Sequence, residues 1–339
     1  MTARLGFSAL EHLIRDTFRQ AWASGICGMM LAITATCVAL CLSVNVSGDV
    51  TLPKDDEPVF FLPQPAPRSL GVKTISPEEA RREGVATLAG RMTLAFGAVS
   101  FPVSRERRDA VHFLELILAG GVAGTFGLLL ALVWTAGFVP TFLEPGAAAV
   151  LLAKPTARWR LLLGKYLGVL AFVALQVTLF VALTWLALGA RTNVWSLTYW
   201  WSVPLLLVQF AIFYGFSILV AVVTRSTIAC VFGATLFWCL AWAINYGVVM
   251  ARGIQDPQHL LPGAVGLIEM AYWLFPKPID AGLILFNALD AANHFDKPEV
   301  FKLLESGRVF SAKLSILSSL LFTGVLLAIS AHQLEATDY

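Results

Sequence analysis

The stretch LEPGAAAVLLAKPTARWRLLLGKYLGVLAF runs from Leu143 to Phe172 and changes character along its length. Its first part sets charged side chains among apolar ones and is interrupted by proline, whereas Tyr166 opens a continuous apolar run. A basic amphipathic segment of this kind is typical of chain that lies along a membrane surface. The apolar run that follows is long enough to cross a bilayer. We therefore predict a surface segment at residues 139–165 and a transmembrane helix at residues 166–188.

The composition of the whole chain supports the same class of protein. The 339 residues are 58% hydrophobic and only 14% charged, whereas a soluble domain carries about 25% charged residues. Six apolar stretches have the length of a membrane-spanning helix: 25–46, 113–138, 166–188, 200–223, 228–250 and 310–331. We predict an all-α polytopic membrane protein with six transmembrane helices.

Few charged residues fall inside these stretches. Glu115 and Lys313 lie near the ends of their stretches, and we expect both side chains to reach the membrane interface. A charged side chain costs much less free energy there than in the centre of the bilayer. The five cysteines all lie within predicted spans, where they act as small apolar residues.

Basic residues in the short connecting segments predict the orientation. An even number of crossings places both termini on one side, and the short segments of that side contain Arg4, Arg15, Arg19, Lys154, Arg158, Arg160, Lys165 and Arg225. The short loop 189–199 on the other side has Arg191 alone. Because short loops rich in Lys and Arg stay in the cytoplasm, we expect both termini to be cytoplasmic in a plasma (inner) membrane. The two long segments carry basic residues too, but long loops cross largely regardless of charge.

The segments outside the spans have their own patterns. Residues 1–24 form an amphipathic stretch that predicts a cytoplasmic interfacial elbow helix. Residues 47–112 predict a small external α/β domain, and residues 251–309 predict external interfacial helices.

Within the predicted external domain, closely spaced prolines after residue 52 favour an extended linker, and residues 76–84 have the caps of a short helix. Alternating apolar residues then predict a β-hairpin, with Met92, Leu94 and Phe96 on one face before a turn at Gly97.

The second apolar stretch has a face of small residues: Ala119, Gly120, Gly121, Ala123, Gly124 and Gly127. Such a face favours close packing against another helix. A hinge is the alternative.

The sequence has no motif that predicts catalysis, nucleotide binding or metal binding. The Gly164-Lys165 pair is followed by Tyr166 and lacks the upstream glycine of a phosphate-binding loop. The five histidines are scattered, without metal-ligand spacing. We expect no catalytic, cofactor-binding or metal-binding residues, no activity as an enzyme and no nucleic-acid partner.

A few polar groups lie at membrane depth. Gln176, Gln209, Tyr214 and Asn245 are candidates for lining a pathway, and Asn245 is the strongest on the outer side. The alternative is that these groups form hydrogen bonds between helices, which is the commoner role.

The segment from Glu144 to Lys165 resembles the loop after the second span in permeases of the ABC transporter type-2 export family. The matching pattern has an acidic residue, an aliphatic run, a proline followed by a basic residue, more aliphatics and Gly-Lys before the third span. These positions are Glu144, Val150, Leu151, Leu152, Pro155, Arg158, Leu161, Leu162, Leu163, Gly164 and Lys165. The elbow, the six spans and the segment before the last span fit the same layout.

The resemblance implies a function and partners. Two such subunits, either two copies or a copy with a related permease, would form the translocation pathway of an exporter in the bilayer. A separate cytosolic ATPase, which binds ATP and Mg²⁺, would dock on the segment after the second span. The implied coupling residues are Glu144, Lys154, Pro155, Arg158, Arg160, Gly164 and Lys165.

The same sequence features fit two other interpretations. The chain could be a non-transporting membrane anchor or assembly protein with the shape of a permease, or an ion channel or secondary carrier. The segment at residues 47–112 is longer than in the common short members of the family, and it could bind an external protein.

Overall fold

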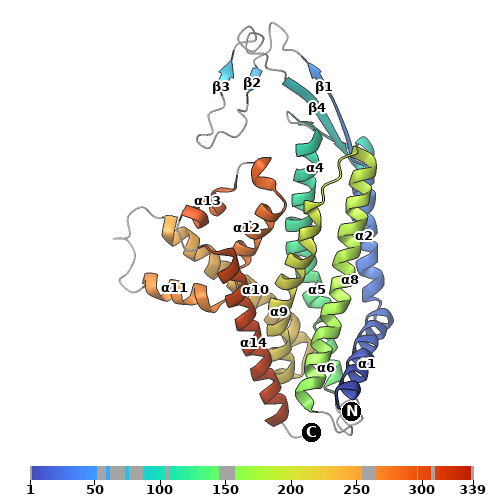
Figure 1. Ribbon diagram of the computed structural model, residues 1–339, viewed down its shortest axis with the longest axis vertical. Coiled ribbons are helices and arrows are strands. Elements are labelled where there is room, and N and C mark those ends of the chain that lie inside the picture. The colour runs from blue at the N-terminus through green and yellow to red at the C-terminus, as the bar shows by residue number, and fades with distance from the viewer. Residues whose placement is uncertain are drawn as a thin grey trace.

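A bundle of long helices carries a small β-sheet at one end (Figure 1). The computed structural model describes residues 2–51, 59–61, 73–75, 87–103, 107–144, 157–253, 264–295, 297–306 and 310–336. The start of helix α1 (Thr2–Ala23) and the end of helix α14 (Ala312–Ala336) lie at the end of the bundle opposite the sheet (Figure 1).

Among the residues that the structure describes, five helical segments are long and apolar enough to cross a membrane: Arg108–Phe142, Arg158–Thr192, Thr198–Thr224, Thr227–Ala251 and Ala312–Ala336. A sixth candidate is a bent pair, His12–Ala23 with Ile26–Leu42, whose two parts meet at 71°. These segments agree with a mostly helical, polytopic membrane protein.

Gly25 makes the bend between α1 and helix α2 (Ile26–Leu42). Its φ of 72° lies in the left-handed region, which glycine adopts without the steric cost that a Cβ brings. Helix α2 is followed closely by strand β1 (Asn45–Thr51), so the apolar helix ends earlier than the predicted span 25–46.

The sheet has the strand order β1-β4-β5, with both pairs antiparallel. Strand β4 (Thr87–Leu94) pairs with β5 (Val99–Val103), at the residues where the sequence predicts a hairpin. Two further strands, β2 (Val59–Phe61) and β3 (Lys73–Ile75), pair with each other. Residues 76–84, where a short helix is predicted, and most of the proline-rich stretch lie outside the described residues.

The hairpin corrects one detail of the predicted alternation. Met92 is buried as expected, but Phe96 is 83% exposed. The strand ends at Leu94, and Ala95 and Phe96 both take positive φ values in the turn η1 (Ala95–Gly97). The two-residue period therefore stops before Phe96.

The second span is built from α4 (Arg107–Leu116), the π-helix η2 (Ile117–Gly127), α5 (Leu128–Thr135) and α6 (Phe138–Phe142). A Cβ added at Gly124 would lie 2.9 Å from the carbonyl oxygen of Ala119, and one at Gly127 would lie 3.1 Å from that of Val122. The small residues therefore fit the wide turns of the π-helix. Gly124 also faces Leu206, so helix packing contributes as well.

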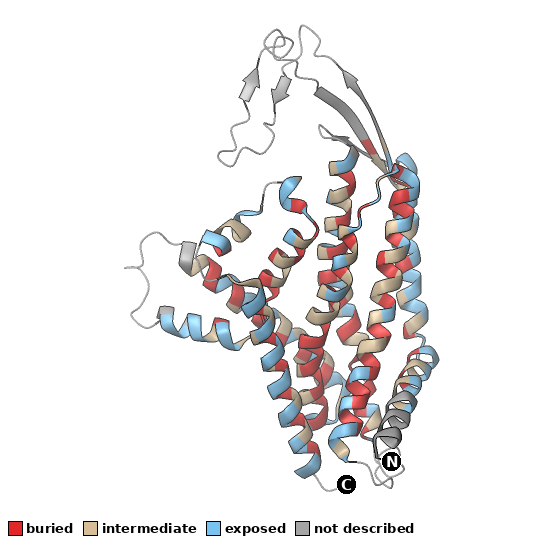
Figure 2. Ribbon diagram, in the orientation of Figure 1, coloured by how far each residue is buried: buried red, intermediate tan, exposed pale blue. Residues whose placement is uncertain are grey.

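Two helices form the centre of the bundle. Helix α8 (Arg158–Thr192) begins eight residues before the predicted span, so its first two turns belong to the predicted surface segment. Helix α9 (Ser202–Thr224) follows the short turn η3 (Thr198–Trp201). Buried residues gather on the inner faces of α8 and α9, whereas exposed residues follow the outer side of α14 (Figure 2).

The remaining helices complete the chain. Helix α10 (Thr227–Gly253) is followed by α11 (Ala264–Leu274), α12 (Pro278–Ala288), the turn η5 (Ala291–Asn293) and α13 (Glu299–Ser306). Helix α12 is apolar but has 11 residues, about 16 Å of helix, which is too short to span a bilayer.

Candidate functional site

The start of α8 is tied to the last helix of the chain. Arg158 is the first residue of α8, and its Nη1 donates a hydrogen bond to the backbone oxygen of Leu334, near the end of α14, at 3.2 Å. Arg160 is exposed, and its guanidinium lies 5.3 Å from the ring centroid of Trp159. One arginine therefore connects two helices, while the other remains at the surface.

Lys165 connects α8 to α1. Its side chain is only 1% exposed, and Nζ lies 2.8 Å from Gln20 Oε1 and 3.2 Å from Asp16 Oδ2. The ammonium also lies 5.9 Å from the ring centroids of Phe138 and Phe142 in α6. Both charge-assisted hydrogen bonds and aromatic faces stabilise a buried cation.

One turn further along α8, Gly168 allows α1 to approach closely. A Cβ at this position would lie 2.7 Å from Thr17 Oγ1 and 3.4 Å from Ile14 Cα. The rings of Phe18 and Phe172 pack edge to face beside it. Since small residues let helices pack closely in a membrane, Gly168 and Lys165 together fix α1 to α8.

The predicted coupling residues therefore fall into two groups. Glu144 and Arg160 are exposed, whereas Gly164 and Lys165 are buried. Arg158 lies between these extremes, and Lys154 and Pro155 lie outside the described residues. Lys165 links α8 to α1 within the chain; contact of any of these residues with an ATPase stays a prediction.

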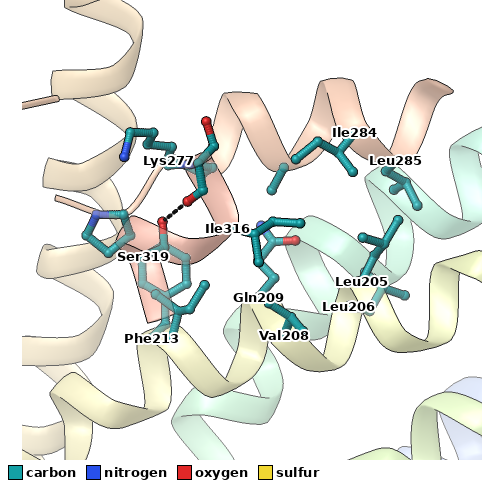
Figure 3. Close-up of a pocket in the computed structure, with 15 residues that line it drawn as sticks. Leu205, Leu206, Val208, Gln209, Phe213, Lys277, Ile284, Leu285, Ile316 and Ser319 are labelled. Carbon is teal, nitrogen blue, oxygen red and sulfur yellow. Dashed lines mark hydrogen bonds between the residues drawn. The ribbon is translucent and has the colours of Figure 1, made fainter. Parts of the chain in front are cut away.

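The predicted pathway residues lie in different places. Tyr214 is buried in a stack between Tyr166 and Phe210, with ring centroids 5.9 Å and 5.3 Å away. Gln209 lines a cavity of about 40 Å³ between α9, α12 and α14, together with Lys277 (Figure 3). That volume holds a few water molecules at most.

Asn245 has structural partners on both sides of its amide. Its Nδ2 donates to Asp280 Oδ1 at 3.2 Å, and its Oδ1 accepts from the backbone N–H of Ile279 at 2.7 Å. This arrangement matches the alternative of hydrogen bonding between helices.

Asp280 is a buried carboxylate at the centre of a hydrogen-bond network, and the sequence did not predict this network. It is 0% exposed and also accepts hydrogen bonds from Tyr272 Oη, at 2.6 Å, and from Ser315 Oγ. The carboxylate thus joins the start of α12 to α10, α11 and α14. The sequence offered one signal, an acidic residue in the first turn of an apolar helix that begins with proline, but the partners are distant along the chain.

Lys277 stands beside this cluster, outside the spans. It is 4% exposed, donates a hydrogen bond to Ser318 Oγ at 2.6 Å and lies over the rings of Tyr272 and Trp273. Burial lowers the pKa of the Lys277 ammonium to about 8, while the nearby charge of Asp280 acts in the opposite direction.

A second polar cluster lies where α4 meets the turn η5. The rings of His112 and His294 stack with centroids 4.1 Å apart, and His294 Nδ1 lies 2.7 Å from Asp109 Oδ1. Glu115 is 1% exposed, with its Oε2 3.3 Å from His112 Nδ1. Its helix therefore turns Glu115 toward the protein and away from the surface, while its depth relative to the membrane interface stays a prediction.

Metal binding has no support in the parts of the chain that the structure describes. There, no group of three or more His, Cys, Asp or Glu side chains could hold a metal ion.

The helices, their lengths and their apolar surfaces define a multi-pass membrane protein. Residues 70–339 match the family described as ABC-2 family transporter protein, and the chain belongs to that family. The resemblance seen in the segment before the third span is thereby confirmed. The protein is a transmembrane permease of an ABC transporter, a class that works with an ABC ATPase. No curated protein matches the chain.

Proposed function

We propose that this chain is the transmembrane permease subunit of an ATP-driven exporter. Two permease subunits form the translocation pathway, and a separate cytosolic ATPase binds ATP and Mg²⁺. The chain itself has no catalytic role. The position of Gly164-Lys165 supports this division, because the pair lies inside a helix and the lysine is occupied by Asp16 and Gln20.

In the proposed orientation both termini and residues 139–165 face the cytoplasm of a plasma membrane, and the β-strands face outside. The bias of basic residues in short loops supports it. The placement of the starts of α1 and α8 and the end of α14 at one end of the bundle, with the sheet at the other, is consistent with it (Figure 1). Helix α1 then serves as an interfacial elbow, and residues 47–112 form an external domain.

The observation that carries the proposal is the set of contacts at the start of α8. Arg158 reaches α14, and Lys165 reaches α1. A displacement of the docked ATPase would therefore be passed to three helices at once. A surface anchor would not require buried links of this kind.

The test is purification of the tagged chain from its native membranes, followed by identification of bound proteins and measurement of ATP hydrolysis. An ABC ATPase should copurify. Charge reversal in Glu144→Arg and Arg158→Glu should lower coupled hydrolysis on the order of tenfold, the effect of losing one interfacial charge contact.

The matched control is Lys302→Glu, a charge reversal at a partly exposed residue of α13. It should leave hydrolysis unchanged. Normal coupled hydrolysis in both reversed variants would contradict the docking role, and a correctly inserted chain without any ATPase would favour the anchor or channel readings.

A further inference from the structure

A cavity of about 130 Å³ lies between α2, η2, α5, α8 and α9, separate from the cavity at Gln209. Among the described residues that line it, all are apolar except Thr34 and Gln176, and none is charged. An apolar cavity of similar size accepts a benzene-sized group. The cavity therefore suits part of an uncharged, largely hydrocarbon ligand.

Gln176 places an unusual polar group against this cavity. Its side chain is 5% exposed, and Oε1 has no hydrogen-bond partner among the described residues. The other amide atom, Nε2, has only a long contact to Cys27 Sγ at 3.7 Å. A buried polar atom without a partner costs about 1–3 kcal/mol, so a ligand that supplies the missing hydrogen bond gains affinity.

Thr34 adds a second acceptor at the same cavity. Its hydroxyl donates to the backbone oxygen of Met30 at 3.0 Å, which leaves lone pairs on Oγ1. A ligand hydroxyl can donate its one proton to Gln176 Oε1 or to Thr34 Oγ1, and it can accept a hydrogen bond from the Gln176 amide N–H. It would also satisfy the amide of Gln176 in either orientation.

The mouth of the cavity is apolar and open to the side of the bundle. Phe126 is 68% exposed, Ile33 39% and Leu130 36%. Phe126 and Leu130 lie in a segment long and apolar enough to span the membrane, and Ile33 lies in the bent pair that is the sixth candidate. A second copy of the chain could cover the mouth, but a helix of about 10 Å diameter cannot enter a cavity this small. A single hydrocarbon chain can.

We propose that this cavity binds a membrane-soluble lipid alcohol, with the hydroxyl on Gln176 and the hydrocarbon chain passing Phe126 into the bilayer. The ligand class follows from an apolar wall without charge, a lone buried amide and a lateral mouth. Binding here does not depend on the proposed function, since it requires no ATPase.

The test uses the purified full chain in lipid nanodiscs and a long-chain primary alcohol that carries a photoreactive diazirine. Labelling should map to peptides that contain Met30, Phe126 or Trp134, which line the cavity. Unlabelled alcohol should compete. The methyl ether of the same probe should label weakly, because it cannot donate a hydrogen bond.

The variant Gln176→Leu should reduce labelling by the alcohol about five- to tenfold, the worth of one buried hydrogen bond. Its unfolding temperature should be unchanged or higher, because an unpaired buried amide is removed. Gln209→Leu is the matched control at the other cavity and should keep full labelling.

Three results would overturn the proposal: equal labelling of wild type and Gln176→Leu, equal labelling by the ether, or labels that map away from the cavity. Cross-linking between two copies from a photoreactive residue at Phe126, with no lipid label, would assign the mouth to a subunit interface instead. Failure to recover an ATPase would bear on the proposed function and leave the labelling result intact.

Discussion

Lys165 holds a positive charge at the junction of α1, α6 and α8, and both of its polar partners come from α1. Removing the partners of a buried charge costs more than replacing the charge itself by an apolar group. The double variant Asp16→Ala/Gln20→Ala should therefore lower the free energy of unfolding by about 1–3 kcal/mol. Lys165→Met should leave it nearly unchanged.

Thermal unfolding of the purified variants measures this difference. Lys302→Met is the control, because Lys302 is partly exposed and its partner Glu299 is exposed, and a surface pair contributes less than about 1 kcal/mol. A larger loss in Lys165→Met than in the double variant would contradict the assignment of α1 as the partner of this charge.

Lys277 predicts a pH dependence. Its pKa in the folded protein is lowered to about 8, below the value near 10.4 of an exposed lysine. Between about pH 8 and pH 10 the unfolded chain therefore binds a proton that the folded chain has released, so stability should rise with pH across that window. Lys277→Met should remove this rise, and subtracting the two thermal-unfolding profiles isolates it. A difference profile that falls across the window would have the wrong sign for a buried lysine.

The π-helix η2 gives a prediction at the level of one element. Gly124→Ala would place a Cβ 2.9 Å from the Ala119 carbonyl oxygen and 3.4 Å from a methyl of Leu206. Such overpacking should lower stability by about 1–3 kcal/mol. Gly121→Ala is the control in the same π-helix, since nothing lies within 4 Å of its added Cβ. Equal unfolding temperatures for the two variants would argue against a π-helix that requires glycine at residue 124.

The elements also show what a sequence can and cannot predict. Apolar length alone located the helices, because each must bury a hydrocarbon-sized stretch whatever its neighbours are. Apolar length could not locate the start of α8 at Arg158, because the residues between Arg158 and the predicted start at Tyr166 are partly polar but are compatible with a helix. The exposure of Phe96 and the burial of Glu115 depend on a turn and on a helix rotation, which neither composition nor period specifies.

The same limit applies to the candidate site. The spacing of charges around residues 144–165 predicts a functional segment; the family match shows the class of protein, and the role of this segment stays a prediction. Yet the inward direction of Lys165 depends on α1, about 145 residues earlier in the chain. Asp280 likewise accepts hydrogen bonds from residues of three other helices. Because these partners are distant along the chain, such hydrogen bonds can be identified only from the three-dimensional structure.

At the scale of the whole molecule, the orientation predicts which loops are accessible from outside. Single cysteines at Ser69, Ser226 and Ser306, in a background without the five native cysteines, can be labelled with an impermeant thiol reagent on intact cells. Positions 69 and 306 should react and position 226 should not, because short basic loops stay in the cytoplasm. Reaction at 226 alone would invert the whole assignment.

Site-directed photocross-linking tests most directly whether the ATPase docks at the start of α8. A photoreactive amino acid at Ala157, which is exposed just before α8, should give a covalent adduct with an ABC ATPase in native membranes. The same amino acid at Leu197, 73% exposed between α8 and α9 at the other end, should give none. An adduct from position 197, or none from position 157 in a correctly inserted chain, would contradict the account.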